Sequence, residues 1–311
     1  MKVLIGVLQI ICLLWLSGCS SFDPTTRLVI APAERKPISS IDQILAKLFD
    51  KKVPLVLYVH GRGNEPKKTE EGKILEKLEH EYGVKVLMFN WDSKGFILSR
   101  PVDNAKEAVP YLSDVIAKIS DYRKRNPETE HVPVSLLVHS MGNIVLQTAI
   151  EKDLSLTWKD KGLFTNILMT GSDADAEGHN LWVQKLKAND TIIVTINKND
   201  GTLSWSKHDN GKTPLGINPK QPLAINAYYL DVTGLVGNVH RLFQKGKQHG
   251  QISVCKILTS MLRSETPNLE KGEKGLIGKI NERILVPVAN VDKSDSCFTG
   301  SADEPDLDSD D

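Results

Sequence analysis

The stretch from residue 133 to residue 143, Pro-Val-Ser-Leu-Leu-Val-His-Ser-Met-Gly-Asn, predicts the fold. Its apolar run, which ends at Val138, is typical of a strand buried on both faces of a parallel sheet. Ser140 follows in a tight turn, and apolar residues from Ile144 onward recur at helical spacing. A strand, a serine in a sharp turn and a helix form the context of a nucleophile elbow, which lifts the serine Oγ above the sheet edge. Ser140 is therefore a candidate nucleophile.

Met141 and Gly142 support this hypothesis, whereas Val138 counts against it. The N–H of Met141 lies at the expected start of the helix, where a developing oxyanion is stabilised. Gly142 allows the helix to pack close to the strand. The motif departs from its usual pattern at Val138, because a glycine is expected two residues before the serine. The alternative is that Ser140 is a turn residue that only caps a helix.

Length and composition are those of an ordinary globular protein. The 311 residues are 40% hydrophobic and 25% charged, and the formal net charge is zero. A neutral chain gives no reason to expect nucleic acid as a partner. The charge is uneven, because residues 301–311 are rich in aspartate and almost free of apolar side chains. We expect these residues to form a disordered, solubilising acidic tail.

The N-terminus has the pattern of a bacterial lipoprotein signal peptide. Lys2 supplies a positive charge, residues 3–16 form an apolar run too short for a comfortable membrane span, and Leu-Ser-Gly-Cys ends at Cys19. This ending resembles a lipobox, which implies removal of residues 1–18 and lipidation of Cys19 with acyl chains such as palmitate. The same resemblance implies, from Ser20 after the cysteine, sorting to the outer membrane of a host that has one, facing the periplasm. The alternative is an uncleaved membrane anchor with an unmodified Cys19.

Two cysteines remain after this processing, in a compartment that permits disulfides. Cys12 is lost with the signal peptide, while Cys255 and Cys297 stay in the chain. They either pair with each other or remain two free thiols. No Cys-x-x-Cys motif or Cys/His cluster indicates a metal site.

Apolar runs with strand character alternate with amphipathic helical patterns along the chain. The alternation predicts an α/β fold with a doubly wound, mostly parallel sheet and helices on both faces. We expect strands at about residues 53–59, 84–90, 134–138, 166–170, 191–196 and 225–232, and helices at about 41–48, 74–78, 105–119, 144–149 and 252–262. Pro110 either kinks the third of these helices or marks its start.

The expected domain covers residues 37–264. It follows a tether at residues 19–36, in which residues 27–31 are expected to form a short extended piece, and precedes a C-terminal segment, residues 265–300, with no clear pattern. Residues 201–222 lack periodicity of their own, and a loop of that length is often a cover over a functional site.

Polar clusters follow several of the expected strands, and the carboxyl ends of parallel strands meet at one sheet edge. Ser140, Asp200 and His240 each stand just beyond an expected strand. An activated serine needs a base, and the base needs an orienting carboxylate. The sequence therefore predicts that these three residues act together.

Other residues compete for two of these roles. Asp173 and Asp175 are alternatives for the acid, although Asp200 precedes Gly201 at the end of a well-formed strand. His249 is the alternative for the base. We expect His60 and His139, which flank the site, to hold loop backbone rather than to react.

Several stretches together resemble the α/β-hydrolase superfamily. They are a His-Gly strand end at residues 58–64, Trp-Asp-Ser at 91–93, the His-Ser-Met-Gly-Asn elbow, Asn-Asp-Gly-Thr-Leu at 199–203 and Pro-Leu-Gly at 214–216. The chain is similar to a small family of uncharacterised serine hydrolases, and the likeness covers about residues 53–262. It implies that Ser140 is the nucleophile, Asp200 orients the base, His240 is the base, and the backbone N–H groups of Met141 and Arg62 bind the oxyanion.

The resemblance also implies an activity. A triad of this kind cleaves carboxylic ester or thioester bonds through an acyl-enzyme and needs no cofactor. The substrate would be an ester-containing small molecule or lipid, and the enzyme would be anchored to a membrane through Cys19. Val138 and the two competing bases favour the alternative, a lipoprotein of the same fold that binds a lipid or protein partner without turnover. A peptidase or an acyltransferase on the same triad is a third possibility.

Overall fold

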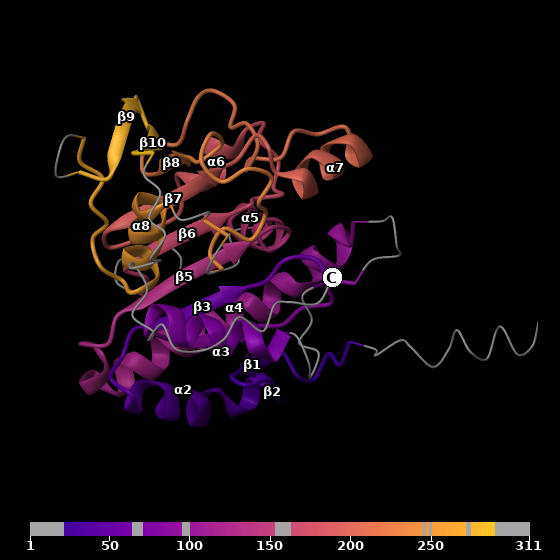
Figure 1. Ribbon diagram of the computed structural model, residues 1–311. Coiled ribbons are helices and arrows are strands. Elements are labelled where there is room, and N and C mark those ends of the chain that lie inside the picture. The colour runs from indigo at the N-terminus through magenta and orange to yellow at the C-terminus, as the bar shows by residue number, and fades with distance from the viewer. Residues whose placement is uncertain are drawn as a thin grey trace, which may run out of the picture.

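A sheet of ten strands runs through the molecule, from β2 at the bottom of Figure 1 to β9 at the top. The computed structural model describes residues 22–63, 71–94, 100–152, 163–244, 247–248, 251–271 and 275–289. The strand order is β2-β1-β4-β3-β5-β6-β7-β8-β10-β9. The strands are β1 (Leu28–Ile30), β2 (Glu34–Lys36), β3 (Leu55–Val59), β4 (Lys85–Phe89), β5 (Val134–His139), β6 (Asn166–Thr170), β7 (Thr191–Ile196), β8 (Tyr228–Asp231), β9 (Ile277–Asn281) and β10 (Ile284–Pro287).

The inner strands are parallel and the outer ones antiparallel. Neighbours from β4 through β3, β5, β6, β7 and β8 to β10 pair in parallel. The pairs β1–β4, β1–β2 and β10–β9 are antiparallel. The predicted fold class, a doubly wound and mostly parallel sheet, is thereby confirmed.

Helices cover both faces of this sheet. They are α2 (Ile41–Asp50), α3 (Glu71–Tyr82), α4 (Val102–Arg125), α5 (Gly142–Glu151), α6 (His179–Val183), α7 (Gly201–Asn210) and α8 (Ile252–Leu262), with 3-10 turns η1 (Ile38–Ser40) and η2 (Pro127–Thr129). One apolar core joins α2, α4, α5 and α6 to the sheet, and a second core joins α3 and α8 to the opposite face.

The central strand β3 shows why its sequence is a continuous apolar run. Leu55, Leu57 and Val59 belong to the first core, whereas Val56 and Tyr58 belong to the second. Successive side chains of a strand point to opposite faces, so a strand covered on both sides must be apolar throughout.

The chain reverses its direction across the sheet at β3. It passes from β3 through α3 to β4 on one side, and then through α4 to β5 on the other side of β3. Ligands of doubly wound sheets bind at the carboxyl ends of strands next to such a reversal. The fold thus directs attention to the ends of β3 and β5, where His60 and Ser140 lie.

The structure differs from the sequence-based expectations in several elements. β1 confirms the short extended piece expected at residues 27–31, but Glu34–Lys36, expected within the tether, form β2, and residues 277–287 of the ill-defined C-terminal segment form β9 and β10. Residues 201–210, expected to be loop, form α7. Pro110 lies inside α4, so it does not mark the start of this helix. Pro110 is exposed, and its lack of an N–H removes one hydrogen bond from the helical ladder.

Several predicted features lie outside the described residues. They include the signal peptide, Cys19, Cys297, His249 and the acidic tail. Within the part of the chain that the structure describes, no helix is both long and apolar enough to cross a membrane. Cys255 is disulfide-bonded, and its pairing with Cys297 stays a prediction.

Candidate active site

Ser140 occupies a strained turn between β5 and α5. Its φ is +53°, a left-handed conformation that is costly for a side chain with a Cβ, by roughly 1–2 kcal/mol. Three backbone hydrogen bonds hold it there. The N–H of Ser140 donates to Thr170 O (3.0 Å), and Ser140 O accepts from the N–H groups of Asn143 (3.0 Å) and Asp173 (3.2 Å). The strand, turn and helix of the predicted elbow are therefore confirmed.

Two glycines provide the space that this turn needs. A Cβ on Gly61 would lie 2.5 Å from the Cβ of Ser140, and a Cβ on Gly142 would lie 2.6 Å from Val59 O. The usual motif has a glycine two residues before the serine. In this chain the close contacts around the turn are made at Gly61 and Gly142. Val138 itself is fully buried in the core beneath the elbow.

The side chain of Asn143 braces the elbow from the helix side. Its Nδ2 donates to Ser140 O (3.1 Å) and to Val138 O (3.3 Å). Met141 is the N-cap residue of α5, so its N–H precedes the helical hydrogen-bond ladder.

Asp200 and His240 form a hydrogen-bonded pair. The Nδ1 of His240 lies 2.7 Å from Oδ2 of Asp200, which is only 1% exposed. A carboxylate can only accept, so Nδ1–H donates and Nε2 is left as the basic nitrogen of the neutral ring. The other carboxylate oxygen, Oδ1, accepts from the N–H of Leu203 (3.0 Å) and caps α7.

The loop that carries His240 is tied to the same strand end. Nδ2 of Asn197 donates to Gly237 O and to Val239 O, each at 2.9 Å. A Cβ on Gly171 would lie 3.0 Å from both Cε1 and Nδ1 of His240, so this ring sits tightly against the end of β6. Asn197 stands in a polar cluster that the sequence places at a strand end, but its bracing role was missed.

Ser140 and His240 line one pocket of about 530 Å³, together with Arg62, His139 and Thr202. No hydrogen bond joins the Ser140 and His240 side chains among the described residues. Hydrogen bonds between a nucleophile and its base are often long without ligand and tighten when substrate binds. Asp200 does not line this pocket and is joined to it through its hydrogen bond to His240.

Two buried histidines, His60 and His139, lie at the carboxyl ends of β3 and β5. Nδ1–H of His60 donates to Gly61 O (2.7 Å), and His60 O accepts from the indole N–H of Trp91 (2.9 Å). Burial lowers the pKa of His60 to about 4. The ring of His139 packs 4.6 Å from that of His240, and burial followed by the nearby positive charge of His240 lowers the pKa of His139. Both are neutral at neutral pH and hold loop structure, as expected.

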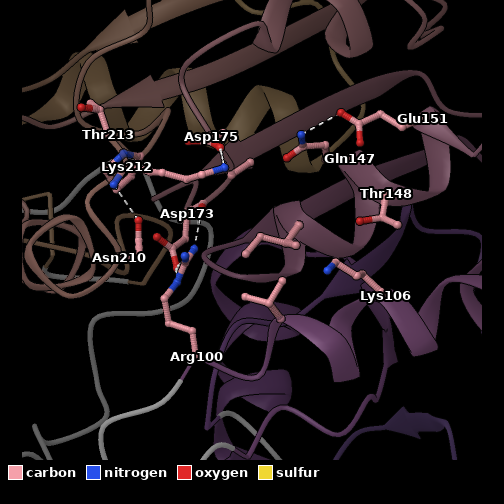
Figure 2. A pocket seen from close by; sticks show the side chains of 14 residues that line it. Arg100, Lys106, Gln147, Thr148, Glu151, Asp173, Asp175, Asn210, Lys212 and Thr213 are labelled. Carbon is pink, nitrogen blue, oxygen red and sulfur yellow. Dashed lines mark hydrogen bonds and ion pairs between the residues drawn. The ribbon is translucent and has the colours of Figure 1, made fainter.

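The two alternative acids face a different pocket, of about 240 Å³ (Figure 2). Arg100 points at Asp173 and binds its Oδ2 through Nε (3.1 Å) and Nη2 (2.9 Å). Ser206 Oγ donates to the other oxygen of Asp173 (2.6 Å), and Lys212 binds Asp175. Neither carboxylate contacts His240. Arg100 was not singled out from the sequence, because nothing local links it to Asp173.

The described residues contain no cluster of three or more His, Cys, Asp or Glu side chains arranged to hold a metal ion.

The family model described as "Alpha/beta hydrolase of unknown function (DUF900)" matches residues 37–221. No curated protein matches the chain.

Similar solved structures include several esterases. An esterase from Pyrobaculum calidifontis is 12% identical, with 72% of this chain and 90% of that chain covered and a TM-score of 0.35. EstE1, a thermophilic carboxylesterase from a metagenomic library, is 13% identical, with 68% and 80% covered and a TM-score of 0.33. Carboxyl esterase 2 from the fungus Tuber melanosporum is 12% identical, with 74% and 82% covered and a TM-score of 0.34.

Proposed function

The chain belongs to the family of alpha/beta hydrolases of unknown function (DUF900), and from this premise we propose that it is a serine hydrolase. It cleaves carboxylic ester or thioester bonds through an acyl-enzyme. The single observation that supports this most is the 2.7 Å bond between Asp200 and His240, whose ring lines the same pocket as Ser140.

In the proposed mechanism, His240 Nε2 accepts the proton of Ser140 Oγ as that oxygen attacks the substrate carbonyl. Asp200 keeps the proton on Nδ1 and stabilises the imidazolium that forms. The N–H groups of Met141 and Arg62 bind the oxyanion, and loss of one such donor typically costs about 3–4 kcal/mol of transition-state stabilisation.

The tetrahedral intermediate then collapses. His240 returns its proton to the leaving alcohol or thiol, and the acyl group stays on Ser140 Oγ. Water, deprotonated by the same imidazole, attacks the acyl-enzyme and releases the acid, which restores the starting state.

A fluorophosphonate probe and a series of 4-nitrophenyl esters test this proposal. The wild-type protein should be labelled and should release 4-nitrophenol, and Ser140→Ala should do neither. Ser204→Ala, which removes an exposed serine of α7, is the matched control and should behave like wild type. Equal labelling of Ser140→Ala and wild type would assign the nucleophile elsewhere.

The competing function, binding of a lipid or protein partner without turnover, has one observation in its favour. The Ser140 and His240 side chains share no hydrogen bond in the described part of the chain. If no ester is hydrolysed and the probe labels neither protein, this second function replaces the first.

We also propose that the mature protein is held on a bacterial membrane through acyl chains on Cys19. The proposal rests on the lipobox-like sequence before that residue. Expression in a bacterial host tests it, because wild type should fractionate with membranes and Cys19→Ala should not. Equal membrane association of the two proteins contradicts lipidation.

A further inference from the structure

Three cationic side chains line the pocket that holds Ser140 and His240 in the described part of the chain. Arg62, Arg241 and Lys247 line it, and we call these three residues the cationic rim. Arg62 follows β3, whereas Arg241 and Lys247 follow β8, so two distant segments bring the cations together. Among the residues that the structure places around this pocket, none is an aspartate or a glutamate.

This excess is local and does not reflect the composition of the protein. The formal net charge of the whole chain is zero. The second pocket is balanced, with three cations and three carboxylates, and two of its carboxylates form ion pairs within it. Those six residues are Arg100, Lys106, Lys212, Glu151, Asp173 and Asp175.

Two of the three side chains of the cationic rim are partly shielded from water. Arg62 and Arg241 are both only partly exposed, so water screens their charges less than those of fully exposed side chains. The guanidinium of Arg62 lies 5.7 Å from the centre of the Trp205 ring, which limits where it can point. The charge of Arg241 also contributes, after burial and His240, to the lowered pKa of His139 at the pocket wall.

We propose that the substrate is an ester that carries an anionic group, such as a carboxylate or a phosphate, and that the cationic rim binds this group. The inference rests on the proposed hydrolase function and specifies its substrate class. Complementary charge in a pocket selects among partners, because the wrong charge is repelled as well as left unpaired.

Two pairs of matched esters test the proposal and locate the anionic group. Mono-4-nitrophenyl adipate carries a carboxylate on its acyl part, and 4-nitrophenyl hexanoate is its neutral counterpart. The hexanoate ester of 5-hydroxy-2-nitrobenzoate carries the carboxylate on its alcohol part instead. At low ionic strength, one of the two charged esters should have a kcat/KM about tenfold above that of the neutral ester.

Substitutions then identify the residues responsible. Lys247→Gln and Arg241→Gln should each lower the ratio of charged to neutral kcat/KM by about threefold, the range of one partly screened ion pair. Added sodium chloride should lower the same ratio. Lys106→Gln removes a cation that lines the second pocket and should leave the ratio of charged to neutral kcat/KM unchanged. A neutral ester turned over as well as both charged ones, with ratios that no variant alters, overturns the proposal.

A binding measurement distinguishes the absence of an anion site from the absence of hydrolase activity. Adipate is titrated calorimetrically into Ser140→Ala and into Ser140→Ala combined with Lys247→Gln. Weaker adipate binding by the double variant supports an anion site even if no ester is hydrolysed. Equal binding by both proteins, or no binding, rejects the anion site even if neutral esters are hydrolysed.

Discussion

Replacement of Asp200 by asparagine separates the two hydrogen bonds that this side chain makes. Oδ1 accepts from the N–H of Leu203 and caps α7, and Oδ2 accepts from Nδ1–H of His240. In Asp200→Asn the Oδ1 acceptor remains, but an NH2 group, which can only donate, replaces Oδ2. His240 can accept this bond only with an unprotonated Nδ1, so its proton moves to Nε2.

The expected loss follows from this change of tautomer. With a proton on Nε2 the imidazole cannot accept the proton of Ser140, and kcat should fall by about 10⁴-fold, as in triads that lose the carboxylate in this way. The free energy of unfolding should change by less than about 1 kcal/mol, because asparagine caps a helix about as well as aspartate. Asp200→Ala should lose the same activity and roughly 1 kcal/mol of stability in addition.

Hydrolysis of 4-nitrophenyl hexanoate gives kcat, and urea unfolding gives the stability. Asp175→Asn is the matched control, since it removes a carboxylate that binds Lys212 at a neighbouring strand end and does not contact His240. It should retain kcat within severalfold. The reasoning is refuted if Asp200→Asn keeps near wild-type activity, or if the control loses as much.

Three further predictions concern the scaffold of the site. Gly142→Ala should lower the free energy of unfolding by roughly 1–3 kcal/mol in urea titrations, because its Cβ would lie 2.6 and 2.7 Å from the backbone oxygens of Val59 and His60; an unchanged midpoint contradicts this. The free energy of unfolding should fall as the pH drops from about 6.5 to about 4, by ~3 kcal/mol from His60 alone. The pKa of His60 is about 4 in the folded protein, so the unfolded chain binds this proton at a higher pH than the folded protein does. The lowered pKa of His139 adds to this loss, and a constant urea midpoint across that range would disprove both contributions. Asn197→Ala should reduce kcat about tenfold or more with secondary structure intact by circular dichroism, since it frees the loop that bears the predicted base; full activity would show that the two bonds are dispensable.

Local patterns in the sequence predicted the centre of the fold well. The elbow was recognisable because β5, Ser140 and α5 are contiguous, and both the apolar run and the helical spacing lie within a few residues. The strands β6 and β7 and the helix α8 were placed at the boundaries that the structure shows. Each is buried along its length, so each carries a strong periodic or continuous apolar signal.

Elements with little buried surface escaped prediction. Only Leu203 and Ser206 are buried in α7, so its polar sequence carries no helical period and was taken for a loop. The strands β2, β9 and β10 have three to five residues each and lie at or near the sheet edges. β2 and β9 are largely exposed and so carry little apolar signal, and β10 pairs with β8, which lies far earlier in the chain.

The choice among acids shows the same limit at the site. Asp173, Asp175 and Asp200 all follow strands, and chain order alone leaves them as competitors. The structure separates them because Arg100, far away in the sequence, binds Asp173, and Lys212 binds Asp175. Asp200 alone among the three contacts His240.

The double hydrogen bonding of Asp200 has a consequence for sorting relatives into active and inactive proteins. Because this aspartate also caps α7, a descendant that has abandoned turnover would still be selected to keep it. Its presence in another sequence is therefore a poor diagnostic of chemistry. Under the proposed mechanism the informative position is His240, whose replacement would leave the helix cap intact and mark a protein without this hydrolase activity.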